Sequence, residues 1–175
     1  ILMSKLLVVV DMQNDFVTGA LGTKEAEAIV DKVEEKIVKE LSEETAVVFT
    51  KDTHNKNYLS TQEGKKLPIE HCIKGTDGWK LVPQLEDYAL ACPIIEKNTF
   101  GSIELAKFVE HNSFDEIEII GLCTDICVIS NALLLKAIVP ETKISVFAQC
   151  CAGVTPETHK NALEAMKICQ IEIEE

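Results

Sequence analysis

The sequence is organised around one stretch, Glu118-Ile119-Ile120-Gly121-Leu122-Cys123-Thr124-Asp125-Ile126-Cys127-Val128. Its apolar run ends at Leu122 and leads through a polar turn into a helical pattern. A strand followed by a helix would make Thr124 and Asp125 capping residues and place Cys127 in the first helical turn, where free N–H groups and the helix dipole favour an anion. The stretch therefore predicts a thiol biased toward its thiolate, although a free cysteine is also commonly a small buried hydrophobe.

Apolar runs alternate with helical patterns along the rest of the chain. The runs predict strands at 6–10, 46–50, 93–96, 117–120, 143–147 and 171–173. Helices are predicted at 26–41 and 125–137, and after Gly101, where Leu105, Phe108 and Val109 share a face. A further helix is predicted after Thr155-Pro156-Glu157, where a hydroxyl and a proline are typical of a helix start. Strands that are apolar throughout and separated by helices are typical of a parallel sheet covered on both faces. The alternation predicts an α/β fold, a three-layer α/β/α sandwich of Rossmann-like type around a six-stranded parallel sheet, with residues 1–175 in a single domain.

The segment from Asp52 to Cys92 interrupts this alternation. Glycines and prolines break any long element within it, and a loop of this length is rare in a compact domain unless it is functional. We interpret the segment as an insertion that helps to form a site.

The composition excludes several classes of partner. The 175 residues include 29 acidic and 17 basic side chains, and the formal charge of -12 repels nucleic acids and anionic lipid surfaces. All basic residues are lysines, so anion recognition cannot use an arginine fork. No apolar run approaches the roughly 18 residues of a membrane span. We expect neither a nucleic-acid partner nor a membrane attachment.

The cysteines and the start of the sequence bear on the compartment. Seven cysteines, an odd number without the rhythm of a small disulfide-rich domain, are typical of a reduced compartment. The opening residues lack the charged start and long apolar middle of a signal peptide. We therefore expect a cytoplasmic protein.

Three reactive side chains follow predicted strands: Asp11, Lys97 and Cys127. In open parallel sheets, ligands bind beyond the carboxyl ends of the strands. A carboxylate there can accept the thiol proton, an ammonium can stabilise both anions, and the thiolate can attack a carbonyl carbon. The set predicts covalent acyl transfer. Because strand ends are polar in any fold of this kind, structural roles for the three side chains stay open at this point.

A second set of polar residues lies in the insertion. Asp52 and His54 are two residues apart, and so lie on one face of an extended segment, and His71 follows in the context Pro68-x-x-His71. This spacing is compatible with a metal site, although two histidines and an aspartate also coincide by chance.

The sequence resembles the isochorismatase-like cysteine hydrolases, and among them the nicotinamidases, over nearly its whole length. The resemblance lies in three motifs: Val8-Val9-Val10-Asp11-Met12-Gln13-Asn14-Asp15-Phe16, Ile95-Glu96-Lys97, and Gly121-Leu122-Cys123-Thr124-Asp125-Ile126-Cys127-Val128. It implies that Asp11, Lys97 and Cys127 form a catalytic triad. It also implies a cis peptide bond before Cys123 and an oxyanion hole made by the backbone N–H groups of Cys123 and Cys127.

The resemblance further implies a metal site. Nicotinamidases bind a divalent metal through an Asp-x-His pair and a later histidine near a proline, which correspond to Asp52, His54 and His71 here. Some members add a glutamate, and Glu63 is the fourth candidate ligand. Zinc is the first candidate for the metal, and iron or manganese would suit the same ligands. In the family this metal holds the pyridine nitrogen of the substrate.

Two phenylalanines are candidates for the substrate pocket. Phe16 and Phe100 stand where family members line the pocket with aromatic rings, although both are equally compatible with a place in the apolar core. The remaining histidines, His111 and His159, are expected to be solvent-facing helix residues without a role.

The resemblance therefore predicts an amidase of NAD salvage. It would convert nicotinamide to nicotinate and ammonia through a cysteine thioester, with a small amide as its partner and a homo-oligomeric assembly. One alternative is a metal-free isochorismatase-like cysteine hydrolase that acts on another small amide. Another is a non-catalytic binding domain of the same fold, which would have no need of all three triad residues.

Overall fold

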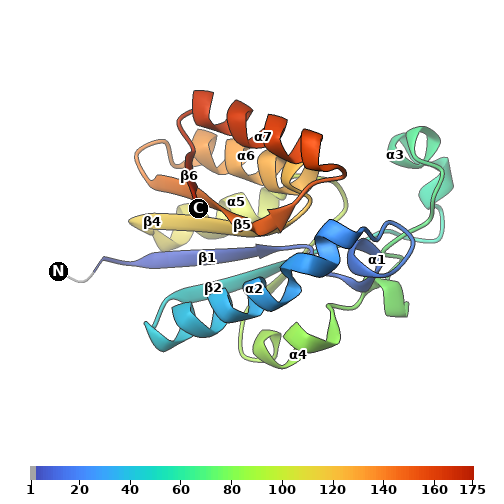
Figure 1. Cartoon of the computed structure of the whole chain (residues 1–175), viewed down its shortest axis with the longest axis horizontal. Coiled ribbons are helices and arrows are strands. Elements are labelled where there is room, and N and C mark those ends of the chain that lie inside the picture. Colours follow the sequence, from blue (N-terminus) through green and yellow to red (C-terminus); the bar gives the residue numbers. More distant parts are fainter. Residues whose placement is uncertain (1–2) are drawn as a thin grey trace.

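A sheet of six parallel strands lies at the centre of the computed structural model, which describes residues 3–175 (Figure 1). The strands are β1 (Lys5–Val10), β2 (Ala46–Asp52), β3 (Ile94–Lys97), β4 (Glu116–Leu122), β5 (Lys143–Ala152) and β6 (Glu172–Glu174). Their order is β3-β2-β1-β4-β5-β6, and each neighbouring pair is parallel. The chain thus builds one half of the sheet outward from β1 and then returns to build the other half from β4.

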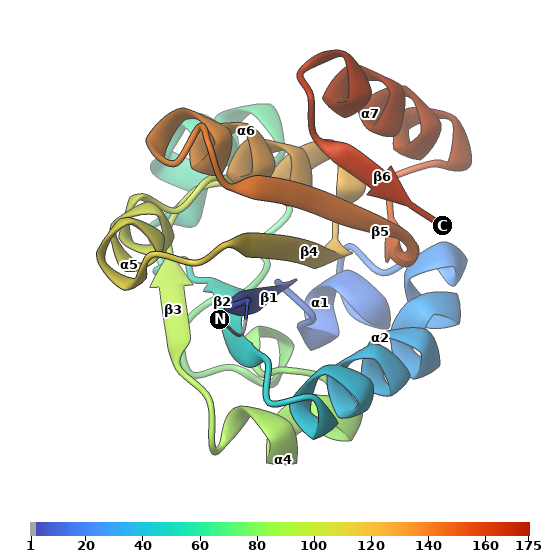
Figure 2. The ribbon, with the colours of Figure 1, turned by 90° about the vertical axis from the view of Figure 1, so that its left-hand side faces the viewer.

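Helices cover both faces of the sheet, as Figures 1 and 2 show. One face carries α1 (Asn14–Val17), α2 (Lys24–Ser42) and α4 (Pro83–Ala89), and the other carries α5 (Ile103–Asn112), α6 (Ile129–Ile138) and α7 (Pro156–Ile168). Alternate residues of a strand point to opposite faces, so Val8 packs with the α5–α7 layer and Val9 with the α2 layer. The predicted three-layer sandwich around a six-stranded parallel sheet is confirmed.

The insertion after β2 is more regular than the sequence suggested. It contains three short helical turns, η1 (Tyr58–Ser60), α3 (Gln62–Lys66) and η2 (Asp77–Trp79), before α4. Helix α4 buries Leu85 and Ala89 in the core, but its seven residues are too few to show a helical period. Figure 1 places α3 beyond the carboxyl ends of the strands, which is where a site-forming insertion is expected.

The junction after β4 differs from its prediction. A single π-helical turn, η3 (Thr124–Val128), follows Cys123 and precedes α6, and no side chain caps it. Thr124 instead makes a hydrogen bond with His159, and Asp125 accepts one from the backbone of Val154. The predicted capping roles are wrong because both side chains bind the α7 region rather than their own helix.

Gly121 brings this junction close to β1. Its φ of +117° favours glycine, and a Cβ at this position would lie 2.1 Å from the carbonyl oxygen of Val10. Since Gly121 pairs directly with Val10, the close approach places the end of β4 beside Asp11. None of the helices in the described part of the chain has the length and apolar character needed to cross a membrane.

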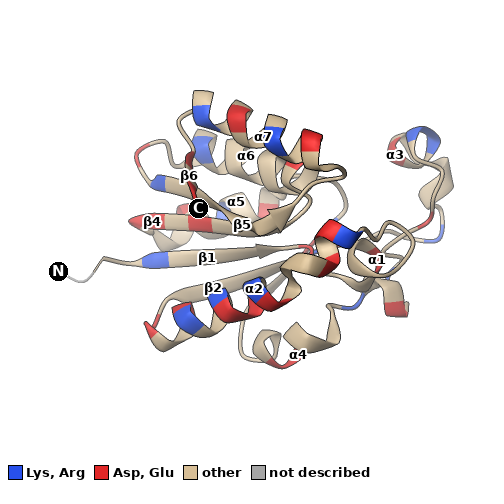
Figure 3. Ribbon diagram, in the orientation of Figure 1, with Lys and Arg blue, Asp and Glu red and all other residues tan. Residues whose placement is uncertain are grey.

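A buried group of charges lies near the amino ends of the strands. Acidic and basic residues alternate along α2 (Figure 3), and Glu40 of this helix accepts hydrogen bonds of 2.8 Å from Lys5 and Lys36. Both lysines also contact Glu118. Burial alone would raise the pKa of Glu40, but its hydrogen bonds with Lys36, Lys5 and Thr45 lower that pKa to about 2. The ion pairs thus hold the carboxylate ionised inside the protein.

We expect Glu40→Gln to lower the free energy of unfolding at pH 7 by about 2 kcal/mol, because the amide keeps the volume but not the charge facing the lysines. The pKa of Glu40 is lower in the folded than in the unfolded protein, so its stabilisation is present above pH 4.5 and is lost as the pH falls toward about 2. Urea unfolding should show the gap between wild type and variant shrinking over that range. The exposed Glu43→Gln is the control, and a gap that stays constant down to pH 3 would contradict the assignment.

Candidate active site

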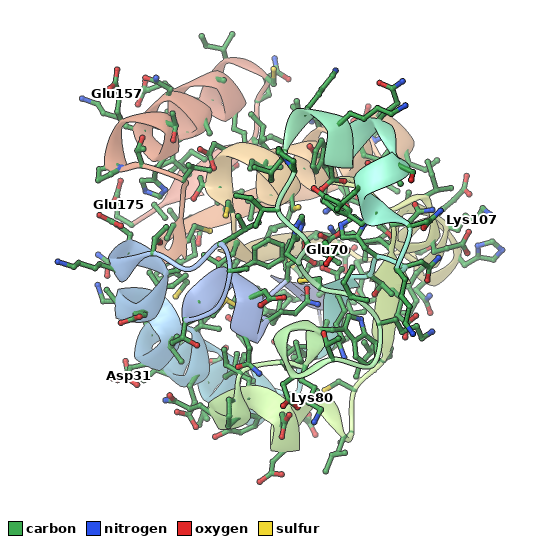
Figure 4. All side chains as sticks on the ribbon, turned by 90° about the vertical axis from the view of Figure 1, so that its right-hand side faces the viewer. Asp31, Glu70, Lys80, Lys107, Glu157 and Glu175 are labelled. Atoms are coloured by element: carbon green, nitrogen blue, oxygen red, sulfur yellow. The ribbon has the colours of Figure 1, made fainter. Side chains whose placement is uncertain are left out.

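Three strand-end residues meet at the carboxyl edge of the sheet, the end of the molecule that faces the viewer in Figure 4. Lys97 Nζ lies 2.6 Å from Asp11 Oδ2 and 3.4 Å from Cys127 Sγ. All three side chains are buried. The structure therefore brings together the carboxylate, the ammonium and the thiol that the sequence places in separate motifs, with the ammonium in contact with both of the other groups.

Hydrogen bonds with neighbouring elements fix two members of this group, Asp11 and Lys97. Asp11 has a φ of +49°, an uncommon conformation for a residue other than glycine that tends to occur at functional sites. Its Oδ1 accepts a 2.7 Å hydrogen bond from Thr50 of β2. Lys97 donates a 3.0 Å hydrogen bond to the carbonyl of Thr99. Neighbouring strands and the loop after β3 thus hold the acid and the amine.

The Cys127 thiol is not biased toward its thiolate in this structure. Burial raises the pKa of both Cys127 and Asp11, and the charge of Lys97 only partly offsets that effect. Burial disfavours the charge of Lys97 as well, but Asp11 and Cys127 raise the pKa of Lys97 overall. Burial therefore disfavours a state in which Asp11 and Cys127 are both ionised. The predicted thiolate bias is wrong because burial outweighs the helix end.

The turn before Cys127 carries the predicted oxyanion donors. The peptide bond between Leu122 and Cys123 is cis, which confirms that prediction. The Cys123 carbonyl accepts hydrogen bonds of 3.0 Å from the N–H groups of Ile126 and Val128. Within residues 3–175, the Cys123 N–H itself donates to no carbonyl or side chain. An N–H group without a partner next to a buried thiol is suited to binding a developing oxyanion, and this role stays a prediction.

Four side chains of β2 and the insertion form a candidate metal centre. The ligand atoms of Asp52, His54, Glu63 and His71 all lie within 4.8 Å of one another. Asp52 Oδ2 is 2.9 Å from His54 Nε2 and 3.4 Å from His71 Nε2, and Glu63 Oε1 is 3.6 Å from each of these nitrogens. Two imidazole nitrogens and two carboxylates that converge in this way suit zinc, iron or manganese.

The surroundings of this centre favour a bound cation. The Ile69 carbonyl accepts a 2.8 Å hydrogen bond from Nδ1 of His71, so Nε2 of the neutral ring points its lone pair at the carboxylates. Burial alone would lower the pKa of His71, but its hydrogen bonds to Asp52 and Glu63 raise that pKa to about 10. The two carboxylates therefore draw positive charge to this nitrogen, as a proton or as a metal ion.

The candidate metal centre adjoins the triad. Lys97 Nζ lies 3.7 Å from Asp52 Oδ1, so one ammonium contacts both groups. Gln13 fixes Asp52 with two hydrogen bonds of 2.8 Å, one to its carbonyl and one from its N–H. The only signal in the sequence for this role of Gln13 is its place in the motif that contains Asp11.

The two candidate pocket phenylalanines lie in different surroundings. Phe16 is buried, and its ring meets the ring of His71 edge-on with 5.5 Å between the centroids. Phe100 is 41% exposed and follows Lys97 in the chain. The exposure of Phe100 excludes a place in the apolar core, whereas Phe16 both packs in the core and borders the metal ligands. Their contact with a substrate stays a prediction.

Comparisons of the sequence and of the fold with known proteins point to the same family. The family model of the isochorismatase domain matches residues 5–174. The nicotinamidase/pyrazinamidase of Mycobacterium tuberculosis is 25% identical to the chain, and the alignment covers 97% of each protein. The crystal structure of nicotinamidase/pyrazinamidase from Bacillus subtilis superimposes with a TM-score of 0.86 at 27% identity, covering 99% of this chain and all of that one. The pyrazinamidase of Pyrococcus horikoshii, solved in complex with zinc, gives a TM-score of 0.82 at 33% identity, covering 97% of this chain and 98% of that one.

We expect the purified protein to bind one zinc ion, and Glu63→Gln to weaken zinc binding at least about tenfold, because an amide oxygen carries no charge. Competition with a chromophoric chelator measures the affinity. Glu70→Gln is the matched control, since Glu70, labelled in Figure 4, belongs to the same insertion but is exposed and is not one of the four candidate ligands. Equal zinc affinity in the two variants would remove Glu63 from the ligand set.

Proposed function

The chain belongs to the isochorismatase family, and we propose that it hydrolyses nicotinamide to nicotinate and ammonia. Membership of this family together with the nicotinamidase relatives makes it a hydrolytic amidase. One observation carries the choice of substrate: Lys97 joins the triad to the candidate metal centre through its 3.7 Å contact with Asp52. A compact amide with a second donor atom, such as a ring nitrogen, can occupy both groups at once.

The four candidate ligands would hold the metal, and their mixed nitrogen and oxygen donors fit zinc, iron or manganese. When bound, the ion would supply a Lewis-acidic position for the ring nitrogen of the substrate. Phe16, beside His71, would border the ring on one side. The role of the insertion is then to orient the substrate so that its carboxamide faces Cys127.

Acylation follows from the triad geometry. Asp11 accepts the proton of the Cys127 thiol, and the sulfur forms a bond to the carboxamide carbon. The carbonyl oxygen becomes an oxyanion facing the N–H groups of Cys123 and Cys127, each worth about 3 kcal/mol when preorganised away from water. As the carbon–nitrogen bond breaks, Asp11 returns its proton to the departing nitrogen, which leaves as ammonia. A thioester on Cys127 remains.

Deacylation uses the same groups in reverse. A water molecule gives a proton to Asp11 while its oxygen attacks the thioester carbon. The carbon–sulfur bond then breaks, the proton on Asp11 returns to the sulfur of Cys127, and nicotinic acid leaves and ionises to nicotinate in water. Lys97 touches both groups throughout, so it balances whichever of them carries the negative charge.

We further propose that the protein works in the cytoplasm, in pyridine nucleotide salvage, and as a homo-oligomer. The seven cysteines are free, as is usual in a reduced compartment. Three large apolar side chains are exposed around the starts of α5 and α6, namely Phe100, Ile103 and Leu133, and a second subunit could cover them. Sedimentation analysis tests the assembly.

We expect Cys127→Ala to lower ammonia release from nicotinamide at least about a thousandfold, because no other group can form the thioester. The exposed Cys169→Ala is the control and should keep full turnover. Ammonia release by the purified variants, with urea unfolding to verify their folding, gives the measurement. Full turnover in Cys127→Ala would exclude the proposed nucleophile.

Removal of the metal should lower the turnover of substrates that have a ring nitrogen, and should have little effect on substrates that lack one. Chelation is expected to lower turnover of nicotinamide and pyrazinamide at least tenfold, because the ring is no longer held, and zinc should restore it. Benzamide, which lacks the nitrogen, should be a poor substrate before and after chelation. If chelation leaves nicotinamide turnover unchanged, the metal does not orient the substrate, and a metal-free amidase acting on another amide becomes the better assignment.

A further inference from the structure

The turn that carries the candidate nucleophile is hydrogen-bonded to α7, a helix much later in the sequence. Thr124 Oγ1, in η3, lies 2.7 Å from Nδ1 of His159, in the first turns of α7. Thr124 is completely buried and His159 is half-buried. The expectation that His159 is a solvent-facing residue without a role is therefore wrong, because its ring points inward to the junction after β4.

A second contact reinforces this tie. Both carboxylate oxygens of Asp125 lie 3.2 Å from the backbone nitrogen of Val154, which precedes α7. A Cβ on Gly153 would lie 2.9 Å from the backbone and Cβ of His159, so a glycine is needed for the chain to pass this close to α7. The loop from β5 to α7 thus wraps around the first two residues of η3.

Helix α7 is a firm support for these contacts. Thr155 and Thr158 form a capping box at its start, in which each side chain accepts a hydrogen bond from the backbone of the other residue. His159 follows directly, so the first turn that carries it is well defined. In contrast, η3 has only five residues and no side-chain cap of its own. Its orientation therefore depends on tertiary contacts.

The tied segment is the one that presents the reacting groups. Thr124 follows directly on Cys123, whose N–H has no partner among the described residues, and precedes Cys127 by three positions. The wholly buried Asn131, near the start of α6, donates a 2.8 Å hydrogen bond to the Cys127 carbonyl. His159 holds the start of the same turn from the α7 side. Preorganised N–H groups stabilise an oxyanion only when such contacts fix their direction.

The surroundings of the His159 ring leave room for a substitution that tests its role. It borders a surface cavity of about 290 Å³ between α2, the end of β5 and the start of α7. A ring of similar size can therefore replace it without overpacking the core.

We propose that His159 is a positioning residue of the amidase: through Thr124 it orients the turn that presents the Cys127 thiol and the N–H groups of Cys123 and Cys127. The inference rests on the proposed function. His159 contributes to the geometry of the transition state rather than to substrate binding, because it reaches the reacting groups only through Thr124. Its loss should accordingly lower kcat and leave KM nearly unchanged.

The test removes the hydrogen bond from either side. His159→Phe keeps an aromatic ring, and Thr124→Val keeps the shape of the side chain but not its hydroxyl. We expect each to lower kcat for nicotinamide about tenfold with KM within twofold of wild type. The double variant should be no slower than either single variant, because all three lack the same bond. His159→Asn, whose amide can reach Thr124, should regain at least half of the lost kcat.

His111→Phe is the matched control, since His111 lies on an exposed helix face and bonds only to the carbonyl of Lys107. It should keep the wild-type kcat. Unchanged kcat in His159→Phe and Thr124→Val, a rise in KM alone, or losses that multiply in the double variant would each overturn the inference. If His159→Phe does not fold, Thr124→Val decides the question from the other side of the bond.

Failure of the proposed function gives a different result. If the wild-type protein releases no ammonia from nicotinamide, that function is excluded, and amide hydrogen exchange then decides the positioning role. Exchange in residues 123–128 should become at least fivefold faster in His159→Phe than in wild type, and should not change in His111→Phe. Equal exchange in that segment would overturn the inference without any substrate.

Discussion

A single buried ammonium determines the chemistry of this protein. Lys97 Nζ contacts Asp11, Cys127 and Asp52 at distances from 2.6 to 3.7 Å. A charge taken out of water is tolerated only when opposite charges surround it. The charge of Lys97 is therefore stabilised by the triad and by the metal centre, and Asp11, Cys127 and Asp52 all raise its pKa. Loss of this one cation would leave carboxylates facing each other in a buried site.

The sheet topology explains why the ammonium can reach all three groups. The strand order places β1 between β2 and β4, so Asp11 at the end of β1 has Asp52 on one side and the Cys127 turn on the other. Lys97 ends β3, the neighbour of β2, and its long side chain reaches across. The positive φ of Asp11 and the close approach of Gly121 to Val10 serve the same purpose, because both occur where the carboxyl ends of β1 and β4 come together.

The sequence predicts most of the fold and half of the site from local patterns. Continuous apolar runs reveal the strands, and strand ends reveal Asp11, Lys97 and Cys127. Local patterns fail where tertiary contacts take over. Thr124 has the composition of a cap, yet its hydroxyl bonds to His159, which is 35 residues away in the chain. Glu63 joins the metal centre through folding of the insertion, so only resemblance to a family could identify it. The predicted thiolate bias of Cys127 fails because a sequence reveals a place near a helix start, whereas the burial that raises the thiol pKa appears only in the fold.

The raised pKa values of Asp11 and Cys127 have a consequence for the kind of bond this site can break. An amide releases an amine, which is a poor leaving group until its nitrogen is protonated. A site with a permanent thiolate would attack readily but would hold no proton for that nitrogen. Burial raises the pKa of Asp11, so this carboxyl can keep the proton it takes from the thiol and deliver it a step later. The same burial that weakens Cys127 as a free nucleophile thus makes the pair suited to amides, where the departure of nitrogen is the harder step.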